Sequence, residues 1–283
     1  MKSTSAVALL ISMWMFSGSG WGVTQAAAPS LGSAFKEWCQ NLTSLSAERR
    51  KTVEILLEKA DTSDCELAAE NLSSRTELYL EVNQITDITP LTGFTNLEQL
   101  YLTDNQIADV SPLAGLINLK KLSLSVNQIT DISPLAGLTN LEQLYLESNQ
   151  IKDVRPLVGL INLEVLVLSN NQITNVNPLA GLTNLDELYL HQNQITNVSP
   201  LAGLTKLTGL GLENNQITDV SPLAGLINLI GLGLGGNQIT DVSPLAGLIN
   251  LEWLWLQGNP IPAGSSANAQ PTCPVSRPDV CLF

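Results

Sequence analysis

The chain has 283 residues with 13 basic and 26 acidic side chains, which gives a formal net charge of −13. Such an acidic chain would repel phosphate groups, so we expect it to bind neither nucleic acid nor an anionic membrane surface. Apolar residues make up 44% of the sequence but aromatic residues only 5%, so any large core must be aliphatic.

Residues 1–28 have the pattern of a signal peptide. Lys2 provides a positive start, an apolar run extends from Ala6 to Phe16, and a small-residue cleavage site spans Ala26 to Ala28. An N-terminal membrane anchor is the alternative, but this run is too short to cross about 30 Å of hydrocarbon. No cysteine stands just after the cleavage site, and no later stretch is long and apolar enough to span a membrane. We therefore expect an exported chain, secreted or periplasmic.

Residues 29–72 are predicted to form a helical N-terminal cap. Ser46 can cap a helix whose apolar stripe contains Val53, Leu56, Leu57 and Ala60. A second short helix is predicted from Asp64 to Asn71. The repeats that follow need such a cap, because their first unit would otherwise expose apolar side chains and an unpaired strand edge.

Residues 73–261 repeat with a period of 22. Leucines stand eight, five and three places before most members of a regular series of asparagines, which we call the ladder asparagines. They are Asn83, Asn105, Asn127, Asn149, Asn171, Asn193, Asn215, Asn237 and Asn259. This period and spacing indicate a leucine-rich repeat solenoid of about nine coils, an α/β fold.

Each coil is predicted to contain a strand, a turn and a short helical return. The alternation in Leu100-Tyr101-Leu102 sends the leucines inward and the tyrosine outward. Asn105 follows at the turn, where its side chain should bond to the backbone. Ser111-Pro112-Leu113 then predicts one helical turn, with serine as N-cap and proline at the first position, and Gly115 is expected to end it.

The repeated unit resembles the internalin-like leucine-rich repeat proteins of bacteria. The matching residues are Asn-Gln-Ile-Thr-Asp-Val-Ser-Pro-Leu-Ala-Gly-Leu-Thr-Asn-Leu units, for instance at 193–207 and 215–229 with small changes. The resemblance covers residues 72–261. It implies a curved solenoid with a concave parallel sheet and short convex 3₁₀ turns, and a concave face that binds proteins. It does not extend to the cysteine-bearing ends, so we do not transfer host invasion to this chain.

Residues 262–283 are predicted to fold over the last coil as a C-terminal cap, and a partly disordered tail is the alternative. The four cysteines allow three pairings. An elongated solenoid keeps its ends apart, so we expect the pairs Cys39–Cys65 and Cys273–Cys281. Neither pair has the spacing of a zinc site.

Little in the sequence favours catalysis. The chain has one histidine, His191, and neither a serine elbow nor a phosphate-loop motif, so we expect no enzyme, no cofactor and no metal. An acidic column four places after the ladder asparagines could hold calcium, because stacked coils are about 4.8 Å apart. The column tolerates asparagine, however, which favours a turn or cap role. Its members are Asp87, Asp109, Asp131, Asp153, Asn175, Asn197, Asp219 and Asp241.

The candidate binding residues lie in outward columns of the sheet, where residues vary while the core leucines do not. All four tyrosines stand four places before a ladder asparagine. Together with nearby glutamates they form an acidic, aromatic strip suited to a basic or mixed-polarity protein partner. The strip comprises Tyr79, Tyr101, Tyr145, Tyr189, Glu98, Glu142, Glu147 and Glu187.

A glycine window follows in the next two strands. The outward positions there are glycines, so they carry no side chains. Tyr189 and His191 border this bare patch on one side, and Trp253 and Trp255 border it on the other. The window contains Gly209, Gly211, Gly231, Gly233 and Gly235. Glycine weakens a strand, so its repeated use suggests a groove where a ligand approaches the backbone. The alternative is drift at exposed positions of duplicated repeats.

These features predict an exported, non-catalytic binding module, expected to be monomeric, that holds a protein or peptide on its concave face. The alternative function is binding of a glycan or another cell-envelope ligand, stacked on the tryptophans beside the glycine window.

Overall fold

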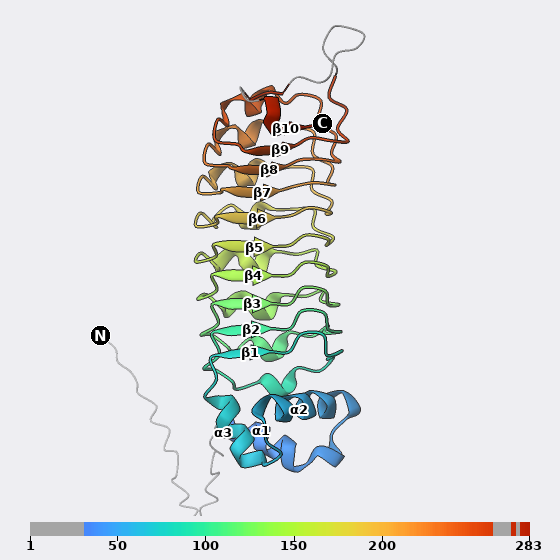
Figure 1. Ribbon diagram of the computed structural model, residues 1–283, viewed down its shortest axis with the longest axis vertical. Helices are drawn as coiled ribbons and strands as arrows, with labels where there is room; N and C mark the ends of the chain where they lie inside the picture. Colours follow the sequence, from blue (N-terminus) through green and yellow to red (C-terminus); the bar gives the residue numbers. More distant parts are fainter. Residues whose placement is uncertain (1–30, 263–272, 276–277) are drawn as a thin grey trace, which may run out of the picture.

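The computed structural model describes residues 31–262, 273–275 and 278–283, which form a solenoid with three helices at its N-terminal end (Figure 1). The predicted signal peptide lies outside the described residues. Within the described ranges, no helix combines the length and the apolar character needed to cross a membrane.

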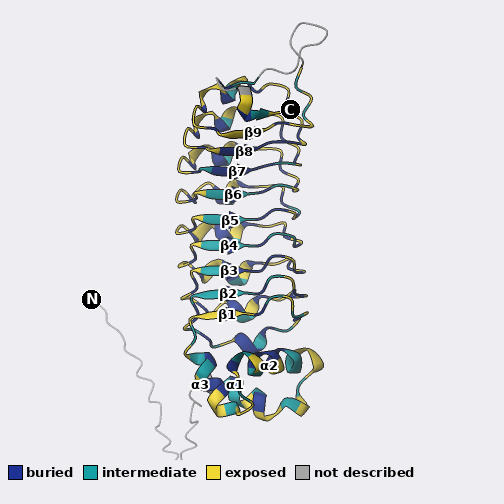
Figure 2. Ribbon diagram, in the orientation of Figure 1, coloured by how far each residue is buried: buried dark blue, intermediate teal, exposed yellow. Residues whose placement is uncertain are grey.

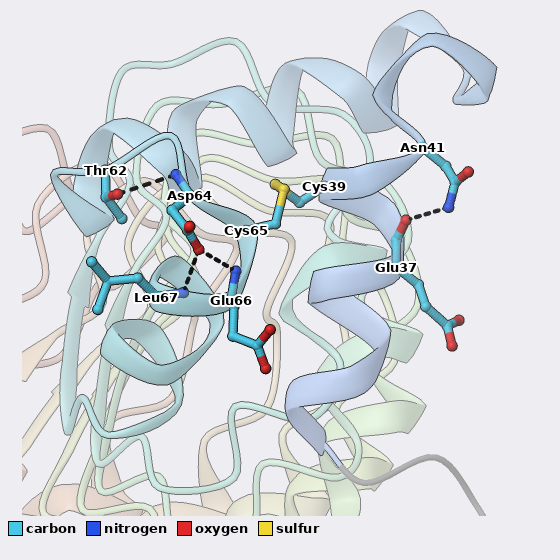
Figure 3. The surroundings of a disulfide bond; sticks show 8 residues. All are labelled: Glu37, Cys39, Asn41, Thr62, Asp64, Cys65, Glu66 and Leu67. Atoms are coloured by element: carbon cyan, nitrogen blue, oxygen red, sulfur yellow. Dashed lines mark hydrogen bonds between the residues drawn. A yellow bond between two sulfur atoms is a disulfide. The ribbon is translucent and has the colours of Figure 1, made fainter.

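The N-terminal helices are α1 (Leu31–Gln40), α2 (Ala47–Ala60) and α3 (Cys65–Ser73). Ser46 caps α2 as predicted, because its hydroxyl accepts from the N–H of Arg49. Asp64 caps α3 by accepting from two backbone N–H groups of the first turn, and the Cys39–Cys65 disulfide joins α1 to α3 (Figure 3). The helical cap is thus confirmed, and the disulfide holds its two outer helices together.

The strands form one parallel sheet, ten-stranded in the described part of the chain, in sequence order (Figure 1). They are β1 (Glu77–Tyr79), β2 (Gln99–Tyr101), β3 (Lys121–Ser123), β4 (Gln143–Tyr145), β5 (Val165–Val167), β6 (Glu187–Tyr189), β7 (Gly209–Gly211), β8 (Gly231–Gly233), β9 (Trp253–Trp255) and β10 (Cys281–Leu282).

Short 3₁₀ turns occupy the opposite side of each coil. They are η2 (Thr89–Leu91), η3 (Ser111–Leu113), η4 (Ser133–Gly137), η5 (Arg155–Gly159), η6 (Asn177–Leu179), η7 (Ser199–Gly203), η8 (Ser221–Gly225) and η9 (Ser243–Gly247); η1 (Leu42–Ser44) and η10 (Pro278–Val280) lie outside the repeats.

The ladder asparagines close each coil, as the sequence predicted. Asn149 Oδ1 accepts from the N–H of Ile129 at 3.0 Å, and its Nδ2 donates to the carbonyls of Leu124, Leu146 and Glu147. Backbone groups at the turn are buried, so without this amide they would lack partners. The same pattern repeats from Asn105 to Asn237.

A second amide ladder, not predicted from the sequence, lies where the chain enters each strand. Asn118 Nδ2 donates to the carbonyl of Thr95 at 2.8 Å, and Asn162 Nδ2 donates to the carbonyl of Thr139 at 2.9 Å. Each bond joins one coil to the coil before it. The two ladders therefore fix the spacing of the coils on both sides of the sheet.

The predicted serine N-cap of the 3₁₀ turns is wrong. Val110 is the cap residue of η3 and makes no side-chain cap bond. Asp109 Oδ1 instead accepts from the N–H of Ser111 at 2.8 Å. The amide oxygen of Asn175 accepts from Asn177 in the same way, which explains why the acidic column tolerates asparagine. Because each carboxylate serves its own turn, the column has a structural role that requires no ion.

At the other end of the solenoid, β10 pairs with β9, and the Cys273–Cys281 disulfide is formed. Val275 and Val280 are buried, and Phe283 packs against the core. The described C-terminal residues therefore add one more strand and cover apolar surface of the last coil.

Candidate functional site

One face of the sheet, which we call the sheet face, carries the outward side chains of β1 to β9. The central leucine of each strand points the other way: Leu100 and Leu144 are fully buried. The register pairs Tyr79 with Tyr101 and places Ser123 between Tyr101 and Tyr145. The predicted tyrosines therefore share one row on one face.

In the N-terminal half of the sheet face, the tyrosines form a stacked group around one lysine. The rings of Tyr79 and Tyr101 are parallel within 6°, with centroids 4.7 Å apart. Lys121 Nζ lies 5.4 Å from the Tyr101 ring and 5.5 Å from the Tyr145 ring, within the range of cation–π attraction. Sequence reasoning did not identify Lys121, although its place in the column six before Asn127 puts it between the two rings.

The hydroxyl groups of two tyrosines donate hydrogen bonds to the side chains that stand two residues before them in the chain. Tyr101 donates to Gln99 Oε1 at 2.7 Å, and Tyr79 donates to Glu77 Oε2 at 2.9 Å. The hydrogen bond to the Glu77 carboxylate, which favours the neutral phenol, raises the pKa of Tyr79. The rings are thus fixed in position before any ligand arrives.

The predicted glutamates do not form one strip. Glu147 and Glu187 belong to outward columns of the sheet. Glu142 instead lines a shallow hollow of about 700 Å³ on the flank, together with Glu164, Asp186 and asparagines of the second ladder. The reason is local: Glu142 precedes the period-two part of the strand, so its side chain leaves the sheet face.

The predicted bare glycine window is wrong, because neighbouring side chains fill it. The Tyr189 ring lies over β7: a Cβ at Gly211 would stand 2.9 Å from its Cδ1. The Trp253 indole occupies the space above Gly231, and the Glu213 carboxylate occupies the space above Gly233. Consequently β7 and β8 are buried along their whole length, whereas the outward residues of β1 and β9 are exposed (Figure 2).

The glycines therefore leave the space that aromatic and acidic side chains of adjacent coils occupy. Burial raises the pKa of Tyr189, and the carboxylates of Glu187 and Glu213 raise it further. The indoles remain accessible, with Trp253 40% exposed and Trp255 45% exposed.

One pocket opens beside this filled window. Its volume is about 420 Å³, and it is lined by His191, Glu213, Asn214, Gly235, Gly236, Trp255, Gln257 and Gly258. His191 Nδ1 shares a hydrogen bond of 2.8 Å with Ser169 Oγ. Glu213 Oε2 is shielded from solvent and has no hydrogen-bond partner among the described residues. Of the lining residues, the sequence predicted His191 and Trp255 as binding residues but not Glu213.

Metal binding has no candidate site among the residues that the structure describes. They contain no group of three or more histidine, cysteine, aspartate or glutamate side chains placed to hold a metal ion. The face is instead a rigid array of rings and carboxylates, suited to contact with a ligand.

Comparison with known families agrees with this architecture. The family described as leucine-rich repeats, in its two-copy form, matches residues 76–115, 117–159, 161–203 and 183–225. A comparison with curated protein sequences gave no match.

Solved structures provide the similar proteins. Internalin C2 from Listeria monocytogenes is 45% identical, with a TM-score of 0.67 over 69% of this chain and 88% of that chain. The internalin InlF from the same organism is 36% identical, with a TM-score of 0.64 over 75% and 69% of the two chains. The plant peptide hormone receptor RGFR1, solved in complex with RGF2, is 25% identical, with a TM-score of 0.60 over 68% of this chain and 34% of that chain.

Proposed function

Since the chain belongs to the leucine-rich repeat family, as an internalin-like bacterial member, we propose that it is an exported, non-catalytic module whose concave sheet face binds a protein or peptide. We propose with it the division of the chain into a signal peptide (1–28), an N-terminal cap (29–72), repeats (73–261) and a C-terminal cap (262–283).

The observation that carries this proposal is the aromatic row on the sheet face. Tyr79, Trp253 and Trp255 are each at least 40% exposed, and Tyr101 and Tyr145 are half-buried between them. Tyrosine and tryptophan are enriched among the residues that contribute most to protein interfaces. Because their rings are already packed in place, binding would cost little side-chain entropy.

Two further features support export and a protein ligand. The disulfides at both ends of the solenoid are typical of proteins that fold in an oxidising compartment. The receptor RGFR1, a structural neighbour, is solved in complex with RGF2. The disulfides are thus consistent with export, and the receptor complex is consistent with a peptide or protein ligand for the present chain.

The test removes exposed rings from one face at a time. A sheet-face variant, Y79A/Y145A/W253A, is compared with a control, I117A/V158A/I161A, which removes three apolar side chains that are 54–56% exposed away from the strands. Immobilised wild-type protein captures a ligand from a native extract, mass spectrometry identifies it, and calorimetry with the purified ligand gives the affinity.

We expect the sheet-face variant to bind at least about thirtyfold more weakly, because interface aromatics commonly contribute 2 kcal/mol or more. The control should bind like the wild type. Equal binding by the wild type and the sheet-face variant would refute the proposal.

A glycan ligand is the second candidate, and the exposed indoles of Trp253 and Trp255 favour it because a flat apolar ring can stack on a sugar. The same three proteins on a glycan array separate the two functions. Glycan binding that is lost in the sheet-face variant, without any captured protein, would support this alternative.

A further inference from the structure

The pocket beside the glycine window combines a carboxylate with an indole. Glu213 and Trp255 both line it, and Gly235 forms part of its floor under the Trp255 ring. Its volume of about 420 Å³ falls within the range of sites that hold small molecules or side chains. The pocket is therefore large enough for one extended side chain.

The Glu213 carboxylate is held in an unfavourable environment. It lies against the backbone of Gly233, in space that any larger residue would occupy. Its Oε2 atom is inaccessible to water and receives no hydrogen bond within the described structure. A carboxylate oxygen that is removed from water and receives no hydrogen bond is an unpaired acceptor, so a cationic donor nearby would compensate it.

Of the residues that line the pocket, only His191 can carry a positive charge, and its Nδ1 atom is engaged with Ser169. The sequence contains neither lysine nor arginine between Lys206 and Arg277. The four ion pairs of the described residues involve no residue of the pocket. Glu213 therefore differs from Glu98, which is paired with Lys120 at 2.7 Å.

From this geometry we infer that the pocket receives a cationic side chain, lysine or arginine, presented by the ligand of the sheet face. The inference rests on the proposed function, which it deepens by naming the chemistry of one anchor residue. The ammonium or guanidinium group lies near Glu213, and the aliphatic stem lies along the Trp255 indole.

The lining suits such a side chain at both ends. Trp255 offers an aromatic face to the stem and a cation–π contact to the charge. Asn214 and Gln257 offer amide oxygens as further acceptors at the rim. The electrostatic attraction is between the ligand's cation and the whole Glu213 carboxylate group. It is strengthened because water is excluded from Oε2. An anionic group would be repelled, and an apolar one would leave the carboxylate uncompensated.

The experiment uses capped amino acids as probes of the oxidised full-length protein. Nα-acetyl-lysine-N-methylamide and the arginine equivalent are titrated while NMR follows the backbone amides of Gly235 and Gly236 and the indole N–H of Trp255. The norleucine equivalent is the uncharged control of similar length. We expect saturable chemical-shift changes at these three groups with the lysine or arginine probe and none with the norleucine probe. Comparison of the two cationic probes shows whether the pocket prefers ammonium or guanidinium.

Two variants assign the effect to the Glu213 carboxylate. E213Q keeps its shape and removes its charge, and it should weaken probe binding about tenfold or more, as expected for a charge-assisted contact. G233A keeps the charge but adds a methyl group where the carboxylate rests, so it should displace a flexible side-chain end, keep the fold and weaken binding. E252Q removes the charge of an exposed glutamate in the coil of Trp255 but outside the pocket lining, so it should bind like the wild type.

The inference is overturned if norleucine shifts the same signals, if no cationic probe binds, or if E213Q and G233A both bind like the wild type. Circular dichroism and melting curves show that each variant is folded. A failure of this inference can be distinguished from a failure of the proposed function. The probes bind without a protein ligand, and the variant Y79A/Y145A/W253A changes no residue that lines the pocket. Ligand capture that survives this variant refutes the proposed function alone.

Discussion

One residue before each ladder asparagine, the backbone adopts the left-handed conformation, with φ between 52° and 59° where the residue is not glycine. Asn170 and Asn214 tolerate this conformation, and Gly236 and Gly258 adopt it freely. Val82 and Val126 do not suit it, because a branched Cβ crowds the following carbonyl. The repeat therefore imposes a local strain at these two valines that glycine and asparagine avoid in other coils.

Replacing Val126 by asparagine should stabilise the protein. Val126 is 46% exposed, so little packing is lost, while asparagine relieves about 1 kcal/mol of left-handed strain. Urea unfolding should show a higher midpoint with an unchanged slope. V158N makes the same exchange at an exposed valine that lacks a positive φ, and it should give no gain. An equal effect of both exchanges would contradict the role of the backbone conformation.

At the scale of elements, helix α2 is joined to the first coil by a cluster around Asp87. Thr52 is fully buried, and its hydroxyl donates to the carbonyl of Asp87 at 2.7 Å. Arg49 Nε donates to Asp87 Oδ2 at 3.0 Å, and Asp87 Oδ1 accepts from the N–H of Thr89 at 2.8 Å. One carboxylate therefore caps a 3₁₀ turn and holds the helical cap against the repeats.

This cluster should make the docking of α2 sensitive to acid. Burial raises the pKa of Asp87, but hydrogen bonds from Thr89 and the charge of Arg49 outweigh it, so the pKa in the folded protein lies below its ordinary value of 3.8. The unfolded chain then binds the proton more tightly. The stabilisation by ionised Asp87 is complete above the unfolded pKa and is lost as the pH falls through the lower, folded pKa.

D87N measures this contribution. At pH 7 it should lower the free energy of unfolding by about 1 kcal/mol, as for a partly exposed ion pair with hydrogen bonds. The difference from the wild type should shrink as the pH falls below the unfolded pKa and vanish once Asp87 is protonated in both states. D131N is the matched control, since the hydrogen bonds to the Asp131 carboxylate in the described structure come from Ser133 in its own turn. A difference between D87N and the wild type that persists after Asp87 is protonated would argue against the charge.

At the scale of the whole molecule, the solenoid is an elongated stack of coils that contact only their neighbours, so its ends are its weak points. The helices close the N-terminal end, and β10 adds a strand at the other (Figure 1). Each end is also closed by a disulfide, spanning 26 residues in the helical cap and 8 residues near the C-terminus.

The longer disulfide loop should stabilise the chain more. Loop-closure entropy gives about 3.5 kcal/mol for Cys39–Cys65 and about 2.5 kcal/mol for Cys273–Cys281. C39S/C65S should therefore lower the midpoint of urea unfolding more than C273S/C281S does. Reductant should lower the wild-type midpoint and leave a variant without either disulfide unchanged. A larger loss for the C-terminal pair would show that strand β10 contributes more than the entropy difference.

Much of this architecture follows from the sequence because a strict period of 22 determines register. Once Leu100 must be buried, Tyr101 must face outward, and the same holds in every coil. Asn105 recurs where the buried backbone of the turn needs an amide, so the ladder could be predicted as well. The cysteine pairs followed from their separation at the two ends of an elongated stack.

Only the tertiary structure decided where outward side chains rest. The pattern places Tyr189 and Glu213 on the sheet face, but it does not say that the tyrosine ring turns onto β7 or that the carboxylate settles over Gly233. It also led to the wrong prediction that Ser111 caps the turn, where the Asp109 carboxylate accepts from the N–H of Ser111 instead. A period determines the direction of each Cα–Cβ bond, whereas rotamers depend on the space left by neighbouring coils. In this chain those coils close the glycine window and leave Glu213 Oε2 without a hydrogen-bond partner among the described residues.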